Sequence, residues 1–256
     1  RPAFARLTPL MLLAVDIGNT STKFGIFDGK RISSKFSIPT DPNSTKDRLK
    51  SAVGHNINKS ISEAIICSVV PKADASIREF LISIGIDRPV FVVNDLDFGL
   101  KINYQPLSAI GTDRLVNSFA AVEKYGAPCI VCSLGTATTI DVVDQNCELL
   151  GGLIAPGMKT MARALHLNTA KLPEVKIAKP KSVFGNTTVE SIQSGIFYGQ
   201  IAMTEGIIQR IKKDKGDNPK VIATGGFASL IAENTDCIDI VNEDLLLDGL
   251  RLLHKR

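Results

Sequence analysis

A pattern of strand, small-residue turn and strand occurs twice in the chain, and this repeat constrains the fold more than any other feature. The first copy is LLAVDIGNTSTKFGIF (residues 12–27), in which two apolar segments flank IGNTS. The second is PCIVCSLGTATTIDVVDQNCELLGG (residues 128–152), which adds a third strand. Short apolar runs beside alternating segments predict β-strands. The repeat therefore predicts two similar α/β domains that face each other across a cleft.

The polar residues of the repeat indicate a bound ligand. Aligning the copies 117 positions apart places Asp16 on Ser133, Gly18 on Gly135 and Thr22 on Thr139. Gly18 can take a positive φ and approach a ligand, Asn19 tolerates a left-handed conformation, and the amides that follow can bind an anion. An acid beside phosphate groups requires a metal ion between them, so this stretch predicts a Mg²⁺–nucleotide complex. The alternative is a plain hairpin with a solvated Asp16.

Length and charge narrow the class of protein. The 256 residues suffice for one large domain or for two of about 125 residues, each with its own core. A net charge of +4, from 30 basic and 26 acidic residues spread along the chain, argues against a nucleic-acid-binding arm. No apolar run approaches the ~20 residues of a membrane span, so we expect a soluble protein. Residues 1–10, which precede Met11, are expected to form an unstructured extension.

The five cysteines indicate reduced thiols of the cytoplasm, because their number is odd and most lie in apolar segments. Cys129 and Cys132 form a CxxC pair, but residues three apart on a strand face opposite ways, which disfavours a redox or zinc site. The three histidines, His55, His166 and His254, have no recognisable Ser or Cys partner and are assigned to the surface or the core.

The rest of the chain alternates strands and helices. Strands are predicted at 31–37, 63–68 and 90–93, and helices near 45–56, 73–85, 111–125 and 188–214. In KVIATGGFASLIA (220–232) a strand leads through Gly225 and Gly226 into a helix, where bare backbone could pack against a purine or could simply form a turn. The apolar face of helix 188–214 suits either a core or a homodimer seam.

Six segments, in order along the chain, resemble type III pantothenate kinases of the acetate and sugar kinase, Hsp70 and actin superfamily. The resemblance covers residues 11–256 and implies duplicated ribonuclease H-like (actin-like ATPase) domains with a central cleft, one at 11–126 and one at 127–256. The segments are DIGNTSTKFGIF (16–27), YQPLSAIGTDR (104–114), SLGTATTIDVVD (133–144), GGLIAPG (151–157), NTTVESIQSG (186–195) and ATGG (223–226).

The resemblance implies that ATP phosphorylates the primary hydroxyl of pantothenate, the first step of coenzyme A synthesis. It also implies a cytoplasmic homodimer whose substrate pocket is completed across the subunit interface. Asp16 is implied to hold Mg²⁺ through water. The residues implied to bind ATP are Asp16, Ile17, Gly18, Asn19, Thr20, Ser21, Thr22, Lys23, Thr136, Gly225 and Gly226. Those implied to bind pantothenate are Tyr104, Gly111, Thr112, Asp113, Arg114 and Thr188.

Asp113 is implied to be the general base. An Asp at a helix start beside Arg114 is ionised at neutral pH and can accept the hydroxyl proton, and Arg114 suits the pantothenate carboxylate. Taken alone, the same pair would indicate a surface ion pair at a helix start.

Two residues depart from the family pattern. Ser133 stands where the family usually has an Asp that ligates a monovalent cation, K⁺ or NH₄⁺, and Thr187 replaces an Asn. Two alternatives therefore remain beside a pantothenate kinase. One is a superfamily kinase that acts on another small alcohol or sugar. The other is a non-catalytic regulatory relative, for which Ser133 is the only indication in the sequence.

Overall fold

The computed structural model describes residues 11–57 and 61–256, and the predicted extension at residues 1–10 lies outside them. The chain folds into two compact units. The first unit comprises the described residues up to Phe98 together with Pro106–Val116 and Leu246–Arg256, and the second comprises Gly99–Gln105 and Asn117–Leu245. The predicted domain boundary between residues 126 and 127 stays a prediction.

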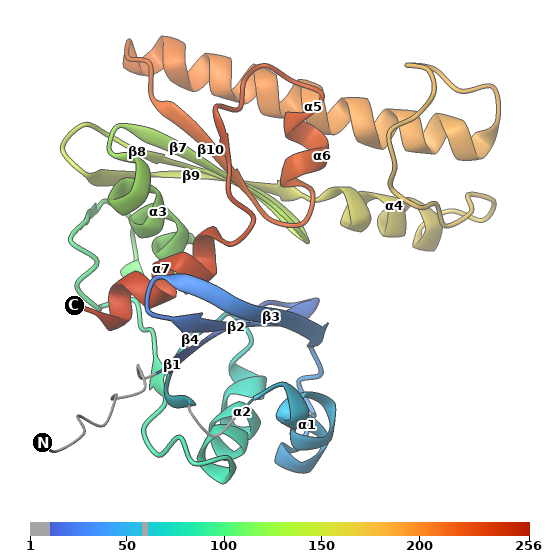
Figure 1. Ribbon diagram of the computed structural model, residues 1–256. Coiled ribbons are helices and arrows are strands. Elements are labelled where there is room, and N and C mark those ends of the chain that lie inside the picture. The colour runs from blue at the N-terminus through green and yellow to red at the C-terminus, as the bar shows by residue number, and fades with distance from the viewer. Residues whose placement is uncertain (1–10, 58–60) are drawn as a thin grey trace, which may run out of the picture. The chain divides into compact units, whose positions relative to one another are not determined.

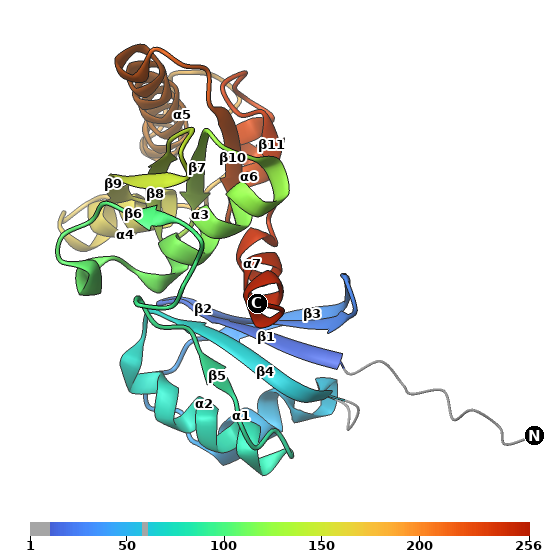
Figure 2. The same cartoon turned by 90° about the vertical axis from the view of Figure 1, so that its left-hand side faces the viewer.

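The first unit is built on a five-stranded sheet with the order β3-β2-β1-β4-β5. Strands β1, β2 and β3 are antiparallel neighbours, whereas β4 and β5 continue the sheet in parallel with β1. Helices α1 and α2 cover one face of this sheet, and α7 lies on the other (Figure 2). The elements are β1 (Met11–Ile17), β2 (Ser21–Asp28), β3 (Arg31–Pro39), α1 (Lys46–Val53), η1 (Gly54–Asn56), β4 (Ile61–Ser68), α2 (Pro71–Ser83), β5 (Val90–Phe91), η2 (Leu107–Ala109), the start of α3 (Thr112–Tyr125) and α7 (Leu245–His254).

The side chains of β1 point alternately to the two faces of the sheet, so core residues lie on one face and Asp16 on the other. Leu13, Val15 and Ile17 are fully buried in the core that the sheet forms with α1 and α2. Because successive side chains of a strand point to opposite faces, Asp16 lies on the face away from this core, at the carboxyl end of β1.

The C-terminal helix α7 belongs to the first unit, although its residues follow the second in the sequence. Leu247 packs against β2 at Gly25, where a Cβ would lie 3.1 Å from the leucine Cδ1. His254 Nε2 lies 2.9 Å from Glu63 Oε2 of β4. Glycine at position 25 therefore lets a helix approach the sheet closely.

The second unit is built on a six-stranded sheet with the order β11-β10-β7-β8-β9-β6. The long helix α5 covers one face of this sheet, and α4 lies beyond the end of β9 (Figure 1). Ile130, Cys132 and Ile140 of the sheet pack against Ile208 of α5. The elements are β6 (Lys101–Ile102), the rest of α3, β7 (Cys129–Leu134), β8 (Ala137–Val143), β9 (Glu148–Pro156), α4 (Met158–Leu167), α5 (Thr188–Lys215), β10 (Lys220–Thr224), α6 (Ala228–Ala232) and β11 (Ile240–Val241).

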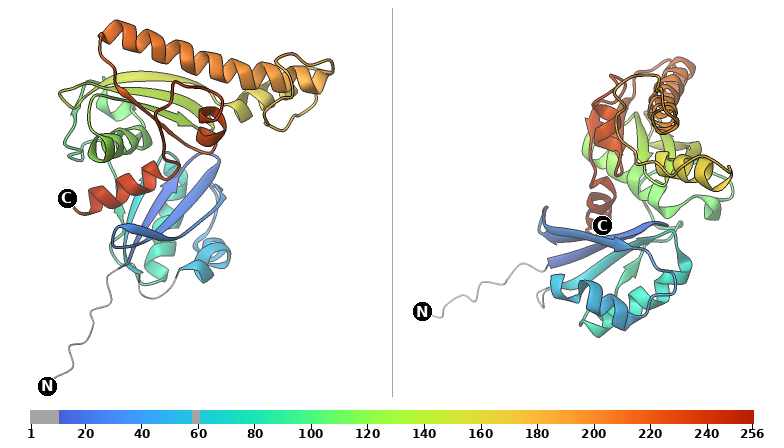
Figure 3. Two further views of the ribbon diagram at one scale, coloured as in Figure 1. Left: turned by 45° about the horizontal axis from the view of Figure 1, so that its top comes forward. Right: turned by 90° about the vertical axis from the view of Figure 1, so that its right-hand side faces the viewer.

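The predicted duplication is confirmed. Strands β9-β8-β7-β10-β11 repeat the order β3-β2-β1-β4-β5, with the same antiparallel and parallel neighbours. The two views of Figure 3 show the sheet of each unit with its helices. Each unit therefore has the ribonuclease H-like arrangement, and β6 adds one parallel strand at the β9 edge of the second sheet.

The sequence alignment of the two hairpins is wrong by one residue after the turn. In the first hairpin Ile17 pairs with Thr22, whereas in the second Leu134 pairs with Thr138. The second turn is one residue shorter, so the offset of 117 positions holds for β1 and β7 but not for β2 and β8. The counterpart of Thr22 is therefore Thr138, not Thr139.

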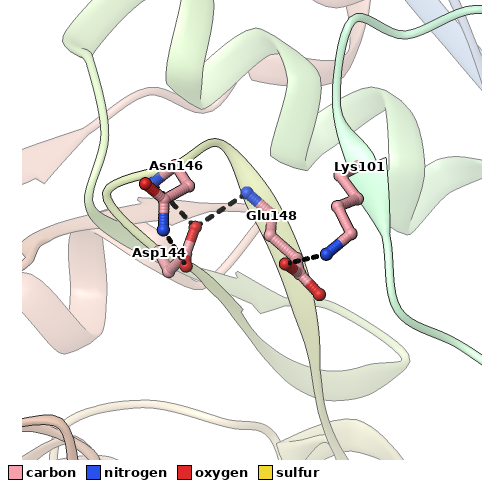
Figure 4. A network of polar contacts seen from close by, with 4 residues as sticks. All are labelled: Lys101, Asp144, Asn146 and Glu148. Carbon is pink, nitrogen blue, oxygen red and sulfur yellow. Dashed lines mark hydrogen bonds and ion pairs between the residues drawn. The ribbon is translucent and has the colours of Figure 1, made fainter.

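Strand β6 is held to β9 at the turn that precedes β9 (Figure 4). Asp144 Oδ1 accepts hydrogen bonds from the amides of Asn146 at 2.9 Å and Glu148 at 2.8 Å. These bonds stabilise the carboxylate and lower the pKa of Asp144. Lys101 Nζ of β6 lies 2.6 Å from Glu148 Oε2. The turn thus presents Glu148 to the added strand.

The described residues contain neither a membrane-spanning helix nor a disulfide. Within residues 11–57 and 61–256, no helix combines the length and the apolar character that crossing a bilayer requires. All five cysteines are free thiols, and Cys129 and Cys132 are buried. Burial raises the pKa of Cys129 to about 12, so this thiol is protonated at neutral pH.

Candidate active site

Asp16 is the most buried acid of the first hairpin. Its side chain is held at the end of β1, where only 9% of the residue is exposed. Lys23 lies directly opposite on β2, with its Nζ 3.7 Å from Asp16 Oδ2. Burial raises the pKa of Asp16 to about 6, against the attraction of Lys23, and the charge of Asp113 raises it further. A buried carboxylate that resists ionisation favours a cation as its partner.

The turn after Asp16 is closed by a hydrogen bond from the Gly18 amide to the Ser21 carbonyl, 3.1 Å long. Neither Gly18 nor Asn19 has a positive φ, so the expectation of left-handed backbone here was wrong. Glycine is favoured at position 18 for a steric reason, since a Cβ would lie 3.2 Å from the Ser21 carbonyl oxygen. Asn19 and Thr20 are exposed at the tip.

Two residues of the predicted ATP-binding stretch point their side chains into the protein. Ile17 is fully buried in the core. Thr22 is 3% exposed, and its hydroxyl lies 2.9 Å from that of Thr40, just after β3. The side chains of these two residues are therefore not available to a ligand at the surface of the turn.

Asp113 sits at the start of α3. Its Oδ1 accepts a hydrogen bond from the Arg114 amide at 2.9 Å, which fixes the carboxylate over the first turn of the helix. A Cβ on Gly111 would lie 2.3 Å from this same oxygen, so glycine at 111 makes room for the carboxylate. Burial raises the pKa of Asp113 from its ordinary value, although Arg114 opposes the shift. A raised pKa improves a carboxylate as a proton acceptor.

Thr112 ties the start of α3 to the end of β4. Its hydroxyl donates to the Ser68 carbonyl at 3.1 Å and accepts from the Cys67 thiol at 3.4 Å. Cys67 in turn pairs with Asp16 across the β1–β4 ladder. This chain of contacts holds Asp16 and Asp113 near each other in one unit. In addition to burial, the charge of Asp113 raises the pKa of Asp16, and the charges of both acids raise the pKa of Cys67.

The equivalent positions in the second unit carry no acid. Ser133 pairs with Thr139 of β8 and with Thr224 of β10, as Asp16 pairs with Lys23 and Cys67. Side chains at paired positions share a face of the sheet, so these three hydroxyl residues form a row across the strands. Neutral oxygens thus stand in the second unit where a carboxylate and an ammonium stand in the first.

Glycines let the turns of the second unit pack closely. A Cβ on Gly225, whose φ is 93°, would lie 2.6 Å from the Leu134 carbonyl oxygen. A Cβ on Gly157 would lie 2.1 Å from the Gly135 carbonyl oxygen. The Thr136 carbonyl accepts bonds from the Gly157 amide at 3.0 Å and the Thr160 hydroxyl at 2.6 Å. The turn around Thr136 is therefore anchored by the residues that follow β9, whereas Gly226 borders open space.

The structure does not bring Tyr104 and Thr188 together within one chain. Tyr104 follows β6, which pairs with Glu148 and Leu149 at the beginning of β9. Thr188 starts α5, which packs against α4 beyond the other end of β9 (Figure 1). Thr187 precedes it as the N-cap, since its hydroxyl accepts the Glu190 amide at 3.2 Å, a role that Asn can also fill.

The donor set around Asp16 suits Mg²⁺ brought by a nucleotide. Mg²⁺ in phosphate-transfer sites takes one or two carboxylates and completes its shell with phosphate oxygens and water. Among the described residues, no group of three or more His, Cys, Asp or Glu side chains is placed to enclose a metal by itself. A single buried carboxylate beside an exposed turn fits the first kind of site and not a fully protein-ligated one.

One supporting residue was missed from the sequence. Thr40 contacts the turn after Asp16, yet it lies 22 positions from Gly18 and belongs to none of the six family segments. Its only signal is its place three residues after the predicted strand 31–37, which follows the hairpin, so a β-meander alignment of the three strands could have found it.

Comparison with known proteins identifies the family. The sequence pattern that defines type III pantothenate kinases matches residues 12–210. A type III pantothenate kinase of Agathobacter rectalis is 40% identical over 253 residues, covering 96% of this chain and 97% of its own. The type III pantothenate kinase of Brevibacillus brevis is also 40% identical over 253 residues, with 96% and 99% covered.

Solved structures share the fold at lower identity. A putative Baf family transcriptional activator from Campylobacter jejuni matches with a TM-score of 0.60 and 19% identity, covering 95% of this chain and 97% of that one. The ethanolamine utilization protein EutJ from Carboxydothermus hydrogenoformans matches with a TM-score of 0.52 and 12% identity, covering 97% and 92%. These two likenesses bear on the fold alone. On the sequence matches, which span nearly the whole chain, the protein belongs to the type III pantothenate kinase family.

Proposed function

We propose that this protein transfers the γ-phosphoryl group of ATP to the primary hydroxyl of pantothenate, the first step of coenzyme A synthesis. The observation that carries the proposal is the pair of carboxylates in the first unit, Asp16 and Asp113, which the Cys67–Thr112 contacts hold near each other. Phosphoryl transfer requires positioning, charge neutralisation and a proton acceptor more than covalent catalysis. Asp16 can serve charge neutralisation by holding Mg²⁺, and Asp113 can serve as the proton acceptor.

Asp113 takes the proton. The hydroxyl oxygen of pantothenate attacks the γ-phosphorus as its proton passes to the Asp113 carboxylate, and ADP leaves. Support comes from the fixed orientation of this carboxylate on the Arg114 amide and from its raised pKa. Gly111, Thr112 and Arg114 flank it as the proposed pantothenate contacts, with Thr112 acting through its backbone because its hydroxyl is bonded to β4.

Asp16 would hold Mg²⁺, which when bound neutralises charge on the ATP phosphates. The turn at Gly18–Ser21 and the ammonium of Lys23 are the proposed phosphate contacts from the first unit. From the second unit we assign Thr136, Gly225 and Gly226 to ATP. Support for the glycines is steric, since Gly225 has no room for a side chain and Gly226 has open space beside it.

We also assign the protein a homodimer. Exposed apolar residues gather on α4, on the start of α5 and on the segment between them, and Phe184 is 81% exposed. Because Tyr104 and Thr188 lie near opposite ends of β9, a second copy could bring its Thr188 to the pantothenate that Tyr104 contacts. The residues of this apolar surface are Leu165, Leu167, Val183, Phe184 and Val189. Five free thiols support a reducing compartment, the cytoplasm.

Ser133 should weaken the binding of a monovalent cation. A hydroxyl offers a cation one neutral oxygen where a carboxylate would offer a full opposing charge. The neighbouring Thr139 and Thr224 are also neutral. We propose that this enzyme either works without added K⁺ or NH₄⁺ or needs far more of it than a Ser133→Asp variant.

The test is ADP release by the purified protein with Mg²⁺–ATP and one acceptor at a time. Pantothenate should raise ADP release well above the rate without acceptor, and simple alcohols and hexoses should not. Turnover with a hexose instead would favour another superfamily kinase. No acceptor-dependent turnover, together with measurable ATP binding, would favour a non-catalytic regulatory relative.

A further inference from the structure

Thr40 makes three contacts with the turn between β1 and β2 and with the start of β2. Its hydroxyl donates to the Gly18 carbonyl at 2.7 Å, and its amide donates to the Thr20 carbonyl at 3.1 Å. Its hydroxyl oxygen also lies 2.9 Å from the Thr22 hydroxyl. The contacts thus reach Gly18 and Thr20 of the turn and Thr22 near the start of β2, from a residue that follows β3.

The donors in this network follow from counting protons. A hydroxyl carries one proton, and a carbonyl can only accept. The Thr40 proton is used on Gly18, so in the contact between the two hydroxyls Thr22 donates and Thr40 accepts. Because Thr22 is 3% exposed, water cannot readily replace Thr40 as its acceptor.

The bond to Gly18 also orients the next amide. In a trans peptide the carbonyl and the following N–H point in opposite directions. With the Gly18 carbonyl held toward Thr40, the Asn19 N–H points away from Thr40, at the exposed tip of the turn. The Gly18 amide is already held by the Ser21 carbonyl, so both polar groups of Gly18 are fixed.

We propose that Thr40 is a positioning residue for Mg²⁺–ATP, which presets the Gly18–Thr22 backbone so that the Asn19 amide at its tip meets the phosphates without rearrangement. This inference rests on the proposed role of the turn in binding ATP. A turn that is preset loses less conformational freedom on binding, and the effect should therefore fall on the nucleotide and not on pantothenate.

The test compares Thr40→Val, Thr40→Ser and Thr45→Val. Valine keeps the shape of threonine without the hydroxyl, and serine restores the hydroxyl. Thr45 is the matched control, because its hydroxyl caps α1 by accepting the Arg48 amide and does not contact the turn. For each protein the Kd of Mg²⁺–ATP is measured by calorimetry, and KM is measured for ATP and for pantothenate.

We expect Thr40→Val to raise the Kd and KM of Mg²⁺–ATP about tenfold, the equivalent of about 1.4 kcal/mol. KM for pantothenate should stay within about twofold, and Thr40→Ser should recover most of the ATP affinity. Thr45→Val should lower the melting temperature while leaving the Kd of Mg²⁺–ATP unchanged.

A double variant separates positioning from stability. In Thr40→Val the buried Thr22 hydroxyl loses its acceptor, so the protein melts at a lower temperature. Adding Thr22→Val removes that unsatisfied hydroxyl and should recover part of the melting temperature, whereas the Kd of Mg²⁺–ATP should stay high because the Gly18 carbonyl is still unheld. A Kd that recovers with the melting temperature would overturn the inference.

Failure of the inference and failure of the proposed function give different results. If Asp16→Asn and Lys23→Ala weaken Mg²⁺–ATP but Thr40→Val binds it like the unmodified protein, the role of Thr40 is refuted and the site stands. If none of the three variants changes the Kd of Mg²⁺–ATP, the turn is not the ATP site, and both are refuted.

Discussion

Replacing Asp16 by Asn should stabilise the protein while it removes the proposed metal ligand. The pKa of Asp16 is raised from 3.8 to about 6, so the folded protein binds a proton there more readily than the unfolded chain does. The stability that Asp16 contributes is therefore full below the unfolded pKa and is lost as the pH rises through the folded one. Because a tenfold change in a proton-binding constant is worth about 1.4 kcal/mol, this rise in the pKa of Asp16 amounts to about 3 kcal/mol.

Asn has the same shape and no charge, so Asp16→Asn should raise the free energy of unfolding by up to about 3 kcal/mol at pH 8 and by only about 0.6 kcal/mol at pH 4. Urea unfolding followed by circular dichroism, without Mg²⁺ or nucleotide, measures both differences. Mg²⁺–ATP at about 100 times its Kd should then add about 2.7 kcal/mol to the unmodified protein and less to the variant. A variant that is less stable at pH 8, or a difference that does not change with pH, would refute this reasoning.

Three further predictions concern other parts of the chain. Titrating KCl against a bulky organic chloride at matched ionic strength should show that Ser133→Asp reaches half-maximal ADP release at a lower K⁺ concentration than the unmodified protein; identical curves would remove position 133 from cation binding. In sedimentation experiments Phe184→Asp should shift the protein toward the monomer, whereas Ile82→Asp, an equally apolar exposed site of the first unit, should not. Thr112→Val should lower kcat more than it raises either KM, because the start of α3 loses its bond to Ser68, and Thr112→Ser should restore kcat.

The repeated hairpin was predictable because alternation within one strand and the small residues of its turn are local signals. These signals locate Asp16 at the end of β1 and Ser133 at the end of β7, and both placements are confirmed. The pairing between strands was less predictable, since a turn shortened by one residue leaves the alternation of each strand intact. The shift that makes Thr138 the counterpart of Thr22 appears only in the strand register.

Most features that the sequence did not predict depend on contacts between distant parts of the chain. Thr40 reaches Gly18 across 22 positions, and Leu247 packs on Gly25 from the far end of the sequence. Neither residue belongs to a local pattern, because each depends on how elements pack after they form. Strand β6, with only two residues, is too short for any periodicity to reveal it.

The central claim is that Asp113 accepts the proton of the pantothenate hydroxyl, and the turnover of Asp113→Asn tests it most directly. Asn keeps the size of the side chain but cannot take the proton, so kcat for pantothenate-dependent ADP release should fall by about 10²–10⁴-fold. The Kd of Mg²⁺–ATP, measured on the same preparation, should stay within about twofold because Asp113 is not assigned to the nucleotide. A variant that binds Mg²⁺–ATP normally and turns over pantothenate at a near-normal rate would contradict the account.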